Sequence, residues 1–384
     1  MTQALIPATF RPPMPRFSDL SRSTRTALVL LLALALAGAG WMAWTKRRSA
    51  HVSDPILDSP ALALEALQAK VLYFNGPARP WLLRQRADLL TAESLDENSD
   101  RARAMTQAVQ SSTLFRQLDR KYRFDALLLV GDPSQYKPLL DKLIETHDWT
   151  LRYADHTSLV FRRDAAKAWD LADFDQQVRK RIAGKAPEVR ATVLALTAVR
   201  VAAAGFPKPA RQLLDEASGL APRLPEVANA CAVYDLARGQ FREASVQVER
   251  ALSSDPDFLP AMATKAQLLY GTKRYSEAYD LSRKVIARLP QDPVLLFYHA
   301  KIAHEAHAYE VEIATMEKLI ALADQEGQPL GGYRLYLGQA YASTGDAKRS
   351  IESFMLALDD PDLPDDQRSF ARENIVRIKK RTGQ

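Results

Sequence analysis

The spacing of hydrophobic and polar residues changes twice along the chain. Residues 26–44 (TALVLLLALALAGAGWMAW) form an apolar run without a charged side chain. Residues 71–163 contain short apolar runs of strand length, separated by stretches in which apolar residues recur at helical spacing. From about residue 190 onward, alanine-rich stretches of helical spacing follow one another. The pattern therefore predicts an apolar span, then a small α/β domain, then a longer and mainly α-helical region.

The uncharged run is long enough to cross a bilayer. At about 1.5 Å per residue, residues 26–44 span roughly the 30 Å hydrocarbon core. Trp41 and Trp44 stand where an interfacial aromatic belt would lie, and basic residues flank both ends. We therefore expect a transmembrane helix over residues 26–44. A cleaved signal peptide is the alternative, because Ala35-Leu36-Ala37 has the small-x-small form of a cleavage site.

The segments beside this run carry the net charge of the chain. Residues 1–25 combine four prolines with scattered serine, threonine and arginine, which predicts a disordered basic tail, and residues 45–60 form a predicted polar linker. The formal net charge is +6, and the seven basic and one acidic side chains of the first 50 residues account for all of it. The rest of the chain holds 45 basic and 45 acidic side chains. A nucleic-acid-binding domain carries its basic excess on its folded part, so we expect no nucleic-acid partner.

A small α/β domain is predicted over residues 61–165. Strand and helix signals alternate there and end in a hairpin that turns at Asp155-His156. The predicted strands are residues 71–74, 126–130, 149–154 and 158–161, and the predicted helices are residues 100–121 and 134–147.

Two motifs of this domain resemble a known family. Tyr122, Asp125 and the run 127–130 have the order tyrosine, x, x, aspartate, apolar strand. A hairpin follows with the order tryptophan, strand, aspartate turn, strand, arginine, carried by Trp149, Tyr153, Asp155, Val160, Phe161 and Arg162. Both are similar to the extramembrane α/β region of C-type integral-membrane glycosyltransferases. The many transmembrane helices of that family, and the acidic residues of its first extracytoplasmic loop where catalysis takes place, have no counterpart in this sequence. The resemblance therefore implies a glycosyltransferase-like module without the enzyme.

The compartment of the soluble part follows only from that resemblance. Basic residues at both ends of the apolar run leave the orientation undecided by charge. The lone Cys231 excludes an intramolecular disulfide and is compatible with either compartment. The resemblance implies a bacterial-type inner membrane with the soluble part in the periplasm. A cytoplasmic soluble part is the alternative.

The helical region repeats itself every 34 residues. Four sets of residues share this period: Gly205 and Gly239; Ala210, Ala244 and Ala278; Pro222, Pro256 and Pro290; and Ala232, Ala266 and Ala300. Small residues suit the place where two helices cross closely, and proline suits the end of a helix. The region is thus similar to tetratricopeptide-repeat (TPR) proteins, whose repeat has this length. That resemblance implies an α-solenoid.

The repeats differ in quality. The unit that includes Leu337 and Phe354 nearly matches the TPR signature, with Ser350 in place of the usual alanine between its helices. The preceding unit has Glu312 where alanine is expected and about four extra residues before Gly331. We expect a connecting helical segment at residues 166–189, about five repeats with one degenerate over residues 190–364, and a basic capping helix at residues 365–384.

The TPR resemblance also implies a binding face. The first helix of each TPR lines a concave groove, and the corresponding residues here are mostly aromatic and amide side chains. They suit an extended peptide or a partner helix of a protein. The lysine-and-asparagine clamp that captures C-terminal carboxylates in chaperone-binding TPRs is not evident. The candidate groove residues are Asn229, Val233, Leu236, Gln267, Tyr270, Tyr298, Lys301, His304, Tyr336 and Gln339.

No motif in the sequence points to catalysis. GxSxG, GxxxxGK[ST], HExxH and a GxGxxG after a strand do not occur, so we predict neither an enzyme nor a cofactor. His299, His304 and His307 are the one concentration of potential metal ligands, and only the last two could share a helix face. A tight site needs three or four converging ligands, so we predict no metal.

The sequence as a whole favours a membrane-tethered TPR scaffold or adaptor that binds a protein partner and is not catalytic. The alternative is an accessory protein of glycan or exopolysaccharide assembly that carries a non-catalytic glycosyltransferase-like module.

Overall fold

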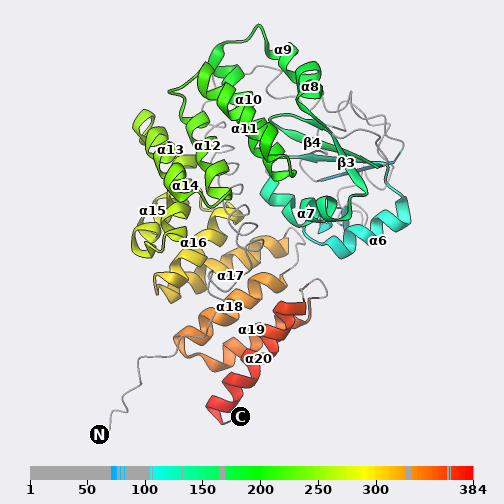
Figure 1. The fold of residues 1–384 in the computed structure, drawn as a ribbon. Helices are drawn as coiled ribbons and strands as arrows, with labels where there is room; N and C mark the ends of the chain where they lie inside the picture. The colour runs from blue at the N-terminus through cyan, green and yellow to red at the C-terminus, as the bar shows by residue number, and fades with distance from the viewer. Residues whose placement is uncertain are drawn as a thin grey trace.

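The computed structural model describes residues 71–383 except 76–77, 79–81, 83–103, 106, 132, 164–168, 326–329, 361–362 and 364. These residues form a small sheet that leads into a row of paired helices (Figure 1). The prediction of a mainly helical solenoid after a small α/β region is confirmed. The predicted tail, the span at residues 26–44 and the linker lie outside the described residues. Within the described residues, no helix combines the length and apolarity needed to cross a bilayer.

The sheet has the predicted strand, helix, strand, helix, hairpin order. Its strands are β1 (Leu72–Phe74), β2 (Ala126–Val130), β3 (Trp149–Ala154) and β4 (Ser158–Arg163). They lie in the order β1-β2-β4-β3, with β1 parallel to β2 and the other neighbours antiparallel. All five residues of β2 are buried, as expected for a central strand covered on both faces. The connecting elements are α6 (Ser112–Tyr122), the 3₁₀ turn η3 (Pro133–Tyr136) and α7 (Lys137–Thr146).

One predicted helix is shorter than its spacing suggests. Helical spacing begins at residue 100, but residues 108–110 form a turn and α6 starts only at Ser112. Ser111 causes the interruption, because its hydroxyl oxygen accepts a hydrogen bond from the Leu114 amide at 3.0 Å. A serine in this position caps a helix N-terminus rather than continuing a helix.

Helix pairs follow the sheet. Short helical pieces connect the two parts: α8 (Leu171–Phe174), a π-helical turn (Asp175–Arg179) and α9 (Lys180–Ile182). The pairs are α10 (Pro187–Ala203) with α11 (Pro207–Leu220), α12 (Pro225–Ala237) with α13 (Phe241–Ser254), α14 (Leu259–Gly271) with α15 (Tyr275–Arg288), α16 (Pro293–Glu305) with α17 (Tyr309–Gln325), and α18 (Gly331–Thr344) with α19 (Ala347–Leu358). The last pair is covered by α20 (Asp365–Thr382).

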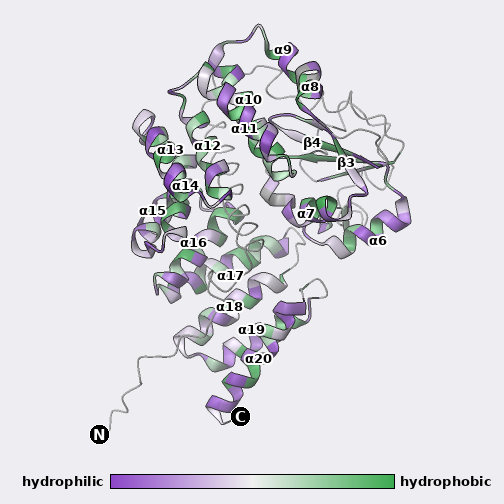
Figure 2. Cartoon of the chain, viewed as in Figure 1, coloured by the Kyte–Doolittle hydropathy of each residue, from purple (hydrophilic) through white to green (hydrophobic). Residues whose placement is uncertain are grey.

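The two helices of a pair differ in burial. Every residue of α12 from Glu226 to Ala237 is buried, whereas α13 buries only Ala244, Val248 and Ala251. The first helix is enclosed because it packs against its own partner and against the neighbouring pairs. Figure 2 shows α20 as mostly hydrophilic, which suits a helix with one side on α19 and the other in solvent.

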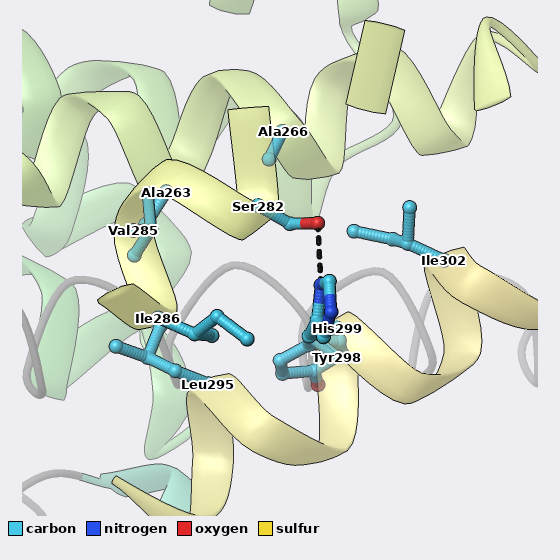
Figure 3. A pocket seen from close by; sticks show the side chains of 9 residues that line it. All are labelled: Ala263, Ala266, Ser282, Val285, Ile286, Leu295, Tyr298, His299 and Ile302. Carbon is cyan, nitrogen blue, oxygen red and sulfur yellow. Dashed lines mark hydrogen bonds between the residues drawn. The ribbon is translucent and has the colours of Figure 1, made fainter. Parts of the chain in front are cut away.

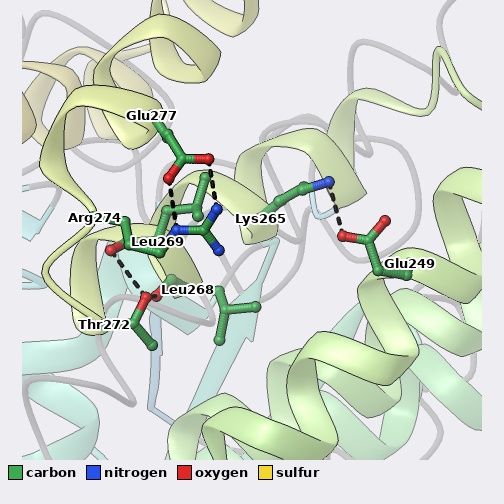
Figure 4. Close-up of polar contacts among 7 residues, drawn as sticks. All are labelled: Glu249, Lys265, Leu268, Leu269, Thr272, Arg274 and Glu277. Atoms are coloured by element: carbon green, nitrogen blue, oxygen red, sulfur yellow. Dashed lines mark hydrogen bonds and ion pairs between the residues drawn. The ribbon is translucent and has the colours of Figure 1, made fainter.

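The turn inside each pair needs a left-handed residue at a repeated position. Gly205, Gly239 and Gly345 have φ of 93°, 73° and 84°, and the equivalent Lys273 and His307 have φ of 64° and 62°. Figure 4 shows the turn after α14, where the Thr272 hydroxyl donates to the Leu268 carbonyl at 2.8 Å. Arg274 then forms two hydrogen bonds to Glu277, at 2.6 and 2.5 Å. Beside this turn, Lys265 pairs with Glu249 of α13 at 2.7 Å.

The sheet and the first helix pairs share one hydrophobic core. It extends from β1 to α14 and includes Trp169, whose ring meets the Phe206 ring at the start of α11 at 6.0 Å. Arg200 of α10 donates to the Gly131 carbonyl, directly after β2, at 3.1 Å. The predicted connecting segment at residues 166–189 therefore marks a change of secondary structure, while the packing continues across it.

We expect Lys273→Gly to stabilise the chain by about 0.5–1 kcal/mol. A side chain in the left-handed region costs about 1–2 kcal/mol, and the greater unfolded-state entropy of glycine offsets part of that gain. Lys273 is exposed, so no packing is lost. Gly239→Ala, which meets no atom within 4 Å but has φ of 73°, is the matched variant and should lose about 1 kcal/mol. Urea unfolding followed by circular dichroism measures both; a loss in Lys273→Gly would show that its side chain is needed.

Candidate functional site

Three aromatic side chains from three consecutive pairs surround one ammonium group. Lys301 Nζ of α16 lies 6.0 Å from the ring centre of Tyr270 (α14), 5.7 Å from that of Phe297 (α16) and 5.9 Å from that of Tyr336 (α18). Phe297 also meets Tyr336 edge-on at 5.3 Å. All four side chains are half-buried. We call Tyr270, Phe297, Lys301 and Tyr336 the Lys301 cluster.

The repeat places these residues together. Lys301 follows Gln267 by 34 residues and Val233 by 68, so all three occupy one repeat position on successive first helices. Gln339 occupies that position in the next pair, 38 residues later, because α17 and its connection to α18 are longer. The cluster thus lies on the face of the first helices that the sequence predicts for binding.

Lys301 is charged at neutral pH. Burial alone would lower the pKa of its ammonium, but the phenol groups of the neighbouring tyrosines, Tyr336 foremost, and the charge of Glu305 outweigh burial and raise the pKa above its ordinary value. Among the described residues, no carboxylate lies within ion-pair distance of Nζ, and the aromatic faces are its contacts. The cluster therefore holds a cation by cation–π contacts alone.

Apart from His304, the other predicted groove residues are buried, Val233 among them. Asn229, Leu236, Gln267 and Gln339 are buried, with exposures of 4%, 2%, 2% and 6%. The side-chain oxygens of Asn229 and Gln339 have no hydrogen-bond partner within the described part of the chain. Tyr298 is only 8% exposed, and it packs against Ala263, Val285 and Leu295. Tyr270, Lys301 and Tyr336 are the predicted residues that the structure brings into direct contact.

Sequence reasoning missed Phe297. It lies 68 residues after Asn229, which is two repeat lengths, so it holds the repeat position from which Asn229 was selected. Its ring contacts Lys301, Tyr336, Tyr298 and Tyr333. The repeat period alone could have identified it.

His304 contacts the second helix of its own pair. Its Nδ1 lies 2.8 Å from Glu312 Oε2, and Glu312 is 1% exposed. Burial disfavours the imidazolium, but the hydrogen bond and charge of Glu312 outweigh burial and raise the pKa of His304. This contact explains why a glutamate replaces the usual alanine in this repeat: the carboxylate has a cationic partner in a site that would otherwise exclude it.

His299 is a buried neutral histidine. It is 1% exposed, and Figure 3 shows it beside Tyr298 at an apolar pocket between α14, α15 and α16, with room for about one water molecule. Its Nδ1 lies 2.8 Å from Ser282 Oγ, and that hydroxyl donates to the Tyr279 carbonyl at 3.0 Å. The Ser282 oxygen therefore accepts a hydrogen bond from the Nδ1–H group of His299. Burial, aided by Arg283, lowers the pKa of His299 to about 4.

The histidines do not converge on a metal. His299 bonds Ser282, His304 bonds Glu312, and His307 Nδ1 lies 2.7 Å from the Tyr309 hydroxyl. In the described part of the chain, no group of three or more histidine, cysteine, aspartate or glutamate side chains is placed to hold an ion.

The aspartates that carry the glycosyltransferase resemblance make internal contacts. Asp125 Oδ1 accepts from the Val71 amide at 2.9 Å, which joins β1 to the start of β2. Asp155 is fully buried and accepts from the Thr157 and Ser158 amides, each at 2.7 Å. Tyr153 donates its hydroxyl to the same carboxylate at 2.7 Å. Both aspartates thus stabilise strand ends of the sheet.

Comparison with known proteins identifies the repeat. Residues 235–296, from the end of α12 into α16, match the family model described as tetratricopeptide repeat, which confirms the predicted repeat type over that stretch. A comparison with curated protein sequences finds no significant match.

Solved structures resemble the chain only weakly. MamA 41-end from Desulfovibrio magneticus RS-1 is 20% identical, covers 46% of this chain and 94% of its own, and has a TM-score of 0.39. TTC0263, a thermophilic TPR protein of Thermus thermophilus, is 16% identical over 48% of this chain and 97% of its own, with a TM-score of 0.38. The human IFIT1 dimer with PPP-AAAA is 13% identical over 79% of this chain and 64% of its own, with a TM-score of 0.44.

We expect acid to destabilise the chain through His299. Its pKa is about 4 in the folded protein and near its ordinary value of 6.5 when unfolded, so only the unfolded chain takes up the proton as pH falls through this window. From pH 7 to pH 5, the wild type should lose about 2 kcal/mol more than His299→Leu, which cannot titrate. Urea unfolding at both pH values measures the difference.

The matched control is His307→Gln, which removes an exposed histidine and should keep the wild-type response. Equal pH dependence in the wild type and His299→Leu would show that folding does not lower the pKa of His299.

Proposed function

We propose that this chain, which contains tetratricopeptide repeats, is a membrane-tethered scaffold or adaptor that binds an extended segment of a protein partner and catalyses no reaction. The Lys301 cluster is the observation that carries the proposal. Its four side chains come from three consecutive first helices and are half-buried, so each keeps a surface that a ligand can reach.

The composition of the cluster suits a binding site. Tyrosine and phenylalanine offer large, rigid contact areas with little rotamer entropy to lose, and such residues contribute most of the affinity at protein interfaces. Phe297 holds the Tyr336 ring edge-on at 5.3 Å, so part of the surface is ordered before a ligand arrives. A preorganised aromatic surface with one cation binds a partner at lower entropic cost than a mobile one.

The membrane tether is a separate part of the proposal. It rests on the uncharged residues 26–44 and on the basic residues that flank them. The periplasmic side is favoured by the resemblance of residues 71–163 to an extracytoplasmic glycosyltransferase region. A tether at this point would keep the repeats near the bilayer surface, where an envelope protein can meet them.

The alternative, an accessory role in glycan assembly, would need a ligand site on the α/β region. The acidic side chains that carry the resemblance are engaged inside the sheet: Asp125 holds the Val71 amide and Asp155 holds its own turn. No described contact of these residues favours a sugar ligand.

We expect Tyr336→Ala to weaken partner binding by about 1–3 kcal/mol and to lower stability less than Tyr298→Ala does, because the Tyr336 ring packs at the edge of the core and is only half-buried. Tyr298→Ala should lower stability as well, because Tyr298 is only 8% exposed. Peptides selected from a displayed library against the full chain in detergent micelles provide the ligand, and calorimetry measures affinity.

Tyr122→Ala is the control for that experiment, since Tyr122 is equally half-buried but lies on α6 of the α/β region. If Tyr336→Ala and Tyr122→Ala bind the selected peptides equally well, the cluster is not the binding site.

For the tether, we expect the mature protein to begin before residue 26 and to sediment with membranes. Alkaline phosphatase fused after Gln384 should be active, because that enzyme folds only outside the cytoplasm. Removal of residues 26–44 should release the chain from the membrane fraction. An N-terminus near Gly38 in the mature protein would instead identify a secreted protein.

A further inference from the structure

The charged side chains on the exposed face of α6 are all cations. They are Arg116, Arg120, Lys121 and, directly after the helix, Arg123. Within the described part of the chain, none of the four forms an ion pair. The single acidic side chain of α6, Asp119, contacts the sheet instead, where both of its oxygens lie 2.6 Å from Arg163 Nη2 of β4. We call these four cations the α6 basic face.

The stability of the helix does not explain this face. The helix dipole favours cations in the last turn, which accounts for Arg120 and Lys121. Arg116 lies a turn earlier, and Arg123 has the left-handed φ of 53° at a position that favours glycine. The packing of α6 on the sheet is supplied by its other side, through Phe115. The α6 basic face therefore has no role in the fold and is open to a ligand.

The α6 basic face lies at the edge of the sheet where the described chain begins. The Val71 amide donates to Asp125 Oδ1 at 2.9 Å, and the Asp125 amide donates to the Val71 carbonyl at 3.0 Å. Leu72 lies beside Ala126 in the parallel register of β1 and β2. The first residues of both strands and the end of α6 thus share one edge, and Asp125 fixes Val71 close to Arg123.

This edge is close along the chain to the predicted span. Between Trp44, where the span ends, and Val71 lie 26 residues. A flexible chain of that length has an end-to-end distance of roughly 30 Å. Figure 1 shows α6 at the outer side of the α/β part, away from α13 and α15, so a flat surface can reach α6 without meeting those helices.

We propose that the α6 basic face binds the anionic phospholipid headgroups of the bilayer to which the chain is tethered. This inference rests on the proposed membrane tether and adds an orientation to it, with the start of β1 and the end of α6 on the headgroups. Guanidinium and ammonium groups donate charge-assisted hydrogen bonds to headgroup phosphates. Each such cation adds to the attraction of a negatively charged leaflet.

The other charges at this edge of the sheet largely cancel. Arg162 Nη2 lies 3.9 Å from Asp125 Oδ2, and Lys142 Nζ lies 3.3 Å from Glu145 Oε2. Asp148, directly before β3, is exposed and has no such pair among the described residues. The four cations of the α6 basic face outnumber this carboxylate, so the edge attracts anions.

A tethered bilayer suits this face better than a free polyanion does. A nucleic acid is held through many phosphate contacts, and four cations on one helix supply few. A tether changes this comparison, because it keeps the leaflet at a high effective concentration beside the face. Four cations alone do not hold an untethered chain on a membrane, so the inference agrees with the expected release of a chain without residues 26–44.

The test measures the approach of α6 to the headgroups in the full chain, reconstituted in lipid nanodiscs. A fluorophore on Gln117→Cys reports from within the α6 basic face, because Gln117 is exposed, and Cys231→Ala removes the native thiol. A nitroxide on a small fraction of the headgroups quenches the fluorophore at short range. Discs of phosphatidylcholine are compared with discs that contain roughly 30% phosphatidylglycerol. We expect stronger quenching in the anionic discs, and less of this excess as salt is raised.

A charge variant assigns the excess to the α6 basic face. Arg116→Gln, Arg120→Gln and Lys121→Gln together should lower the equilibrium constant for contact with the anionic leaflet by roughly 100-fold, at about fivefold for each cation. Quenching should then fall to the level in phosphatidylcholine discs. Glutamine is a good helix former, and circular dichroism checks that the variant is folded.

Two controls match this variant. Arg372→Gln, Arg377→Gln and Lys380→Gln together remove the same charge from exposed positions of α20, and this variant should keep the wild-type excess. The fluorophore on Lys284→Cys, an exposed position of α15, should be quenched equally in both kinds of disc.

Three results would overturn the inference. Equal quenching of the Gln117→Cys fluorophore in both kinds of disc, or an excess that the α6 charge variant keeps, would remove the lipid contact while the tether stands. A chain that does not stay with the discs would reject the tether and this inference together. Binding of duplex DNA that the α6 charge variant loses, without any effect of lipid charge, would assign the face to a nucleic acid.

Discussion

The close approach of the two helices in each pair is the constraint on which the binding face depends. Ala210, Ala244 and Ala278, one repeat apart, are fully buried where their helices cross. In the last pair, a Cβ on Gly338 would lie 2.9 Å from the Phe354 ring, and Ser350 donates to the Gly338 carbonyl at 2.7 Å. Small side chains at these crossings give their pairs a similar geometry, and in the α16–α17 pair the buried Glu312 takes this position and bonds His304. Side chains of successive first helices then align, and Lys301 can reach rings on both neighbouring pairs.

The sequence predicts the repeat better than it predicts the direction of single side chains. The 34-residue period and the alternation of strand and helix signals follow from backbone geometry, and both are seen in the described residues. The same period places Tyr270 and Lys301 on one face. The period does not show that the Tyr298 side chain packs in the core or that His304 contacts Glu312. Those side-chain directions depend on residues of the adjacent helices. The period also places Phe297 on that face, because it lies two repeat lengths after Asn229.

Two different structures cover the ends of the row of first helices. At one end, α10 is buried against the sheet, and the Trp169–Phe206 contact and the Arg200–Gly131 hydrogen bond join the two parts. At the other end, α20 covers the last pair with a mostly hydrophilic outer side.

The apolar spacing does not predict the interruption at Ser111 before α6. There the Ser111 hydroxyl caps the N-terminus of α6, so a new helix begins although the hydrophobic pattern continues.

The covered ends restrict how such a protein can change over evolutionary time. An added repeat before α10 would separate Arg200 from Gly131 and expose the core that α10 shares with the sheet. Duplication of an interior unit between α12 and α18 requires only another crossing of small residues and another left-handed turn. Repeat number can therefore vary in the interior without loss of either end, and each duplication there would lengthen the face that carries Lys301 by one more first helix.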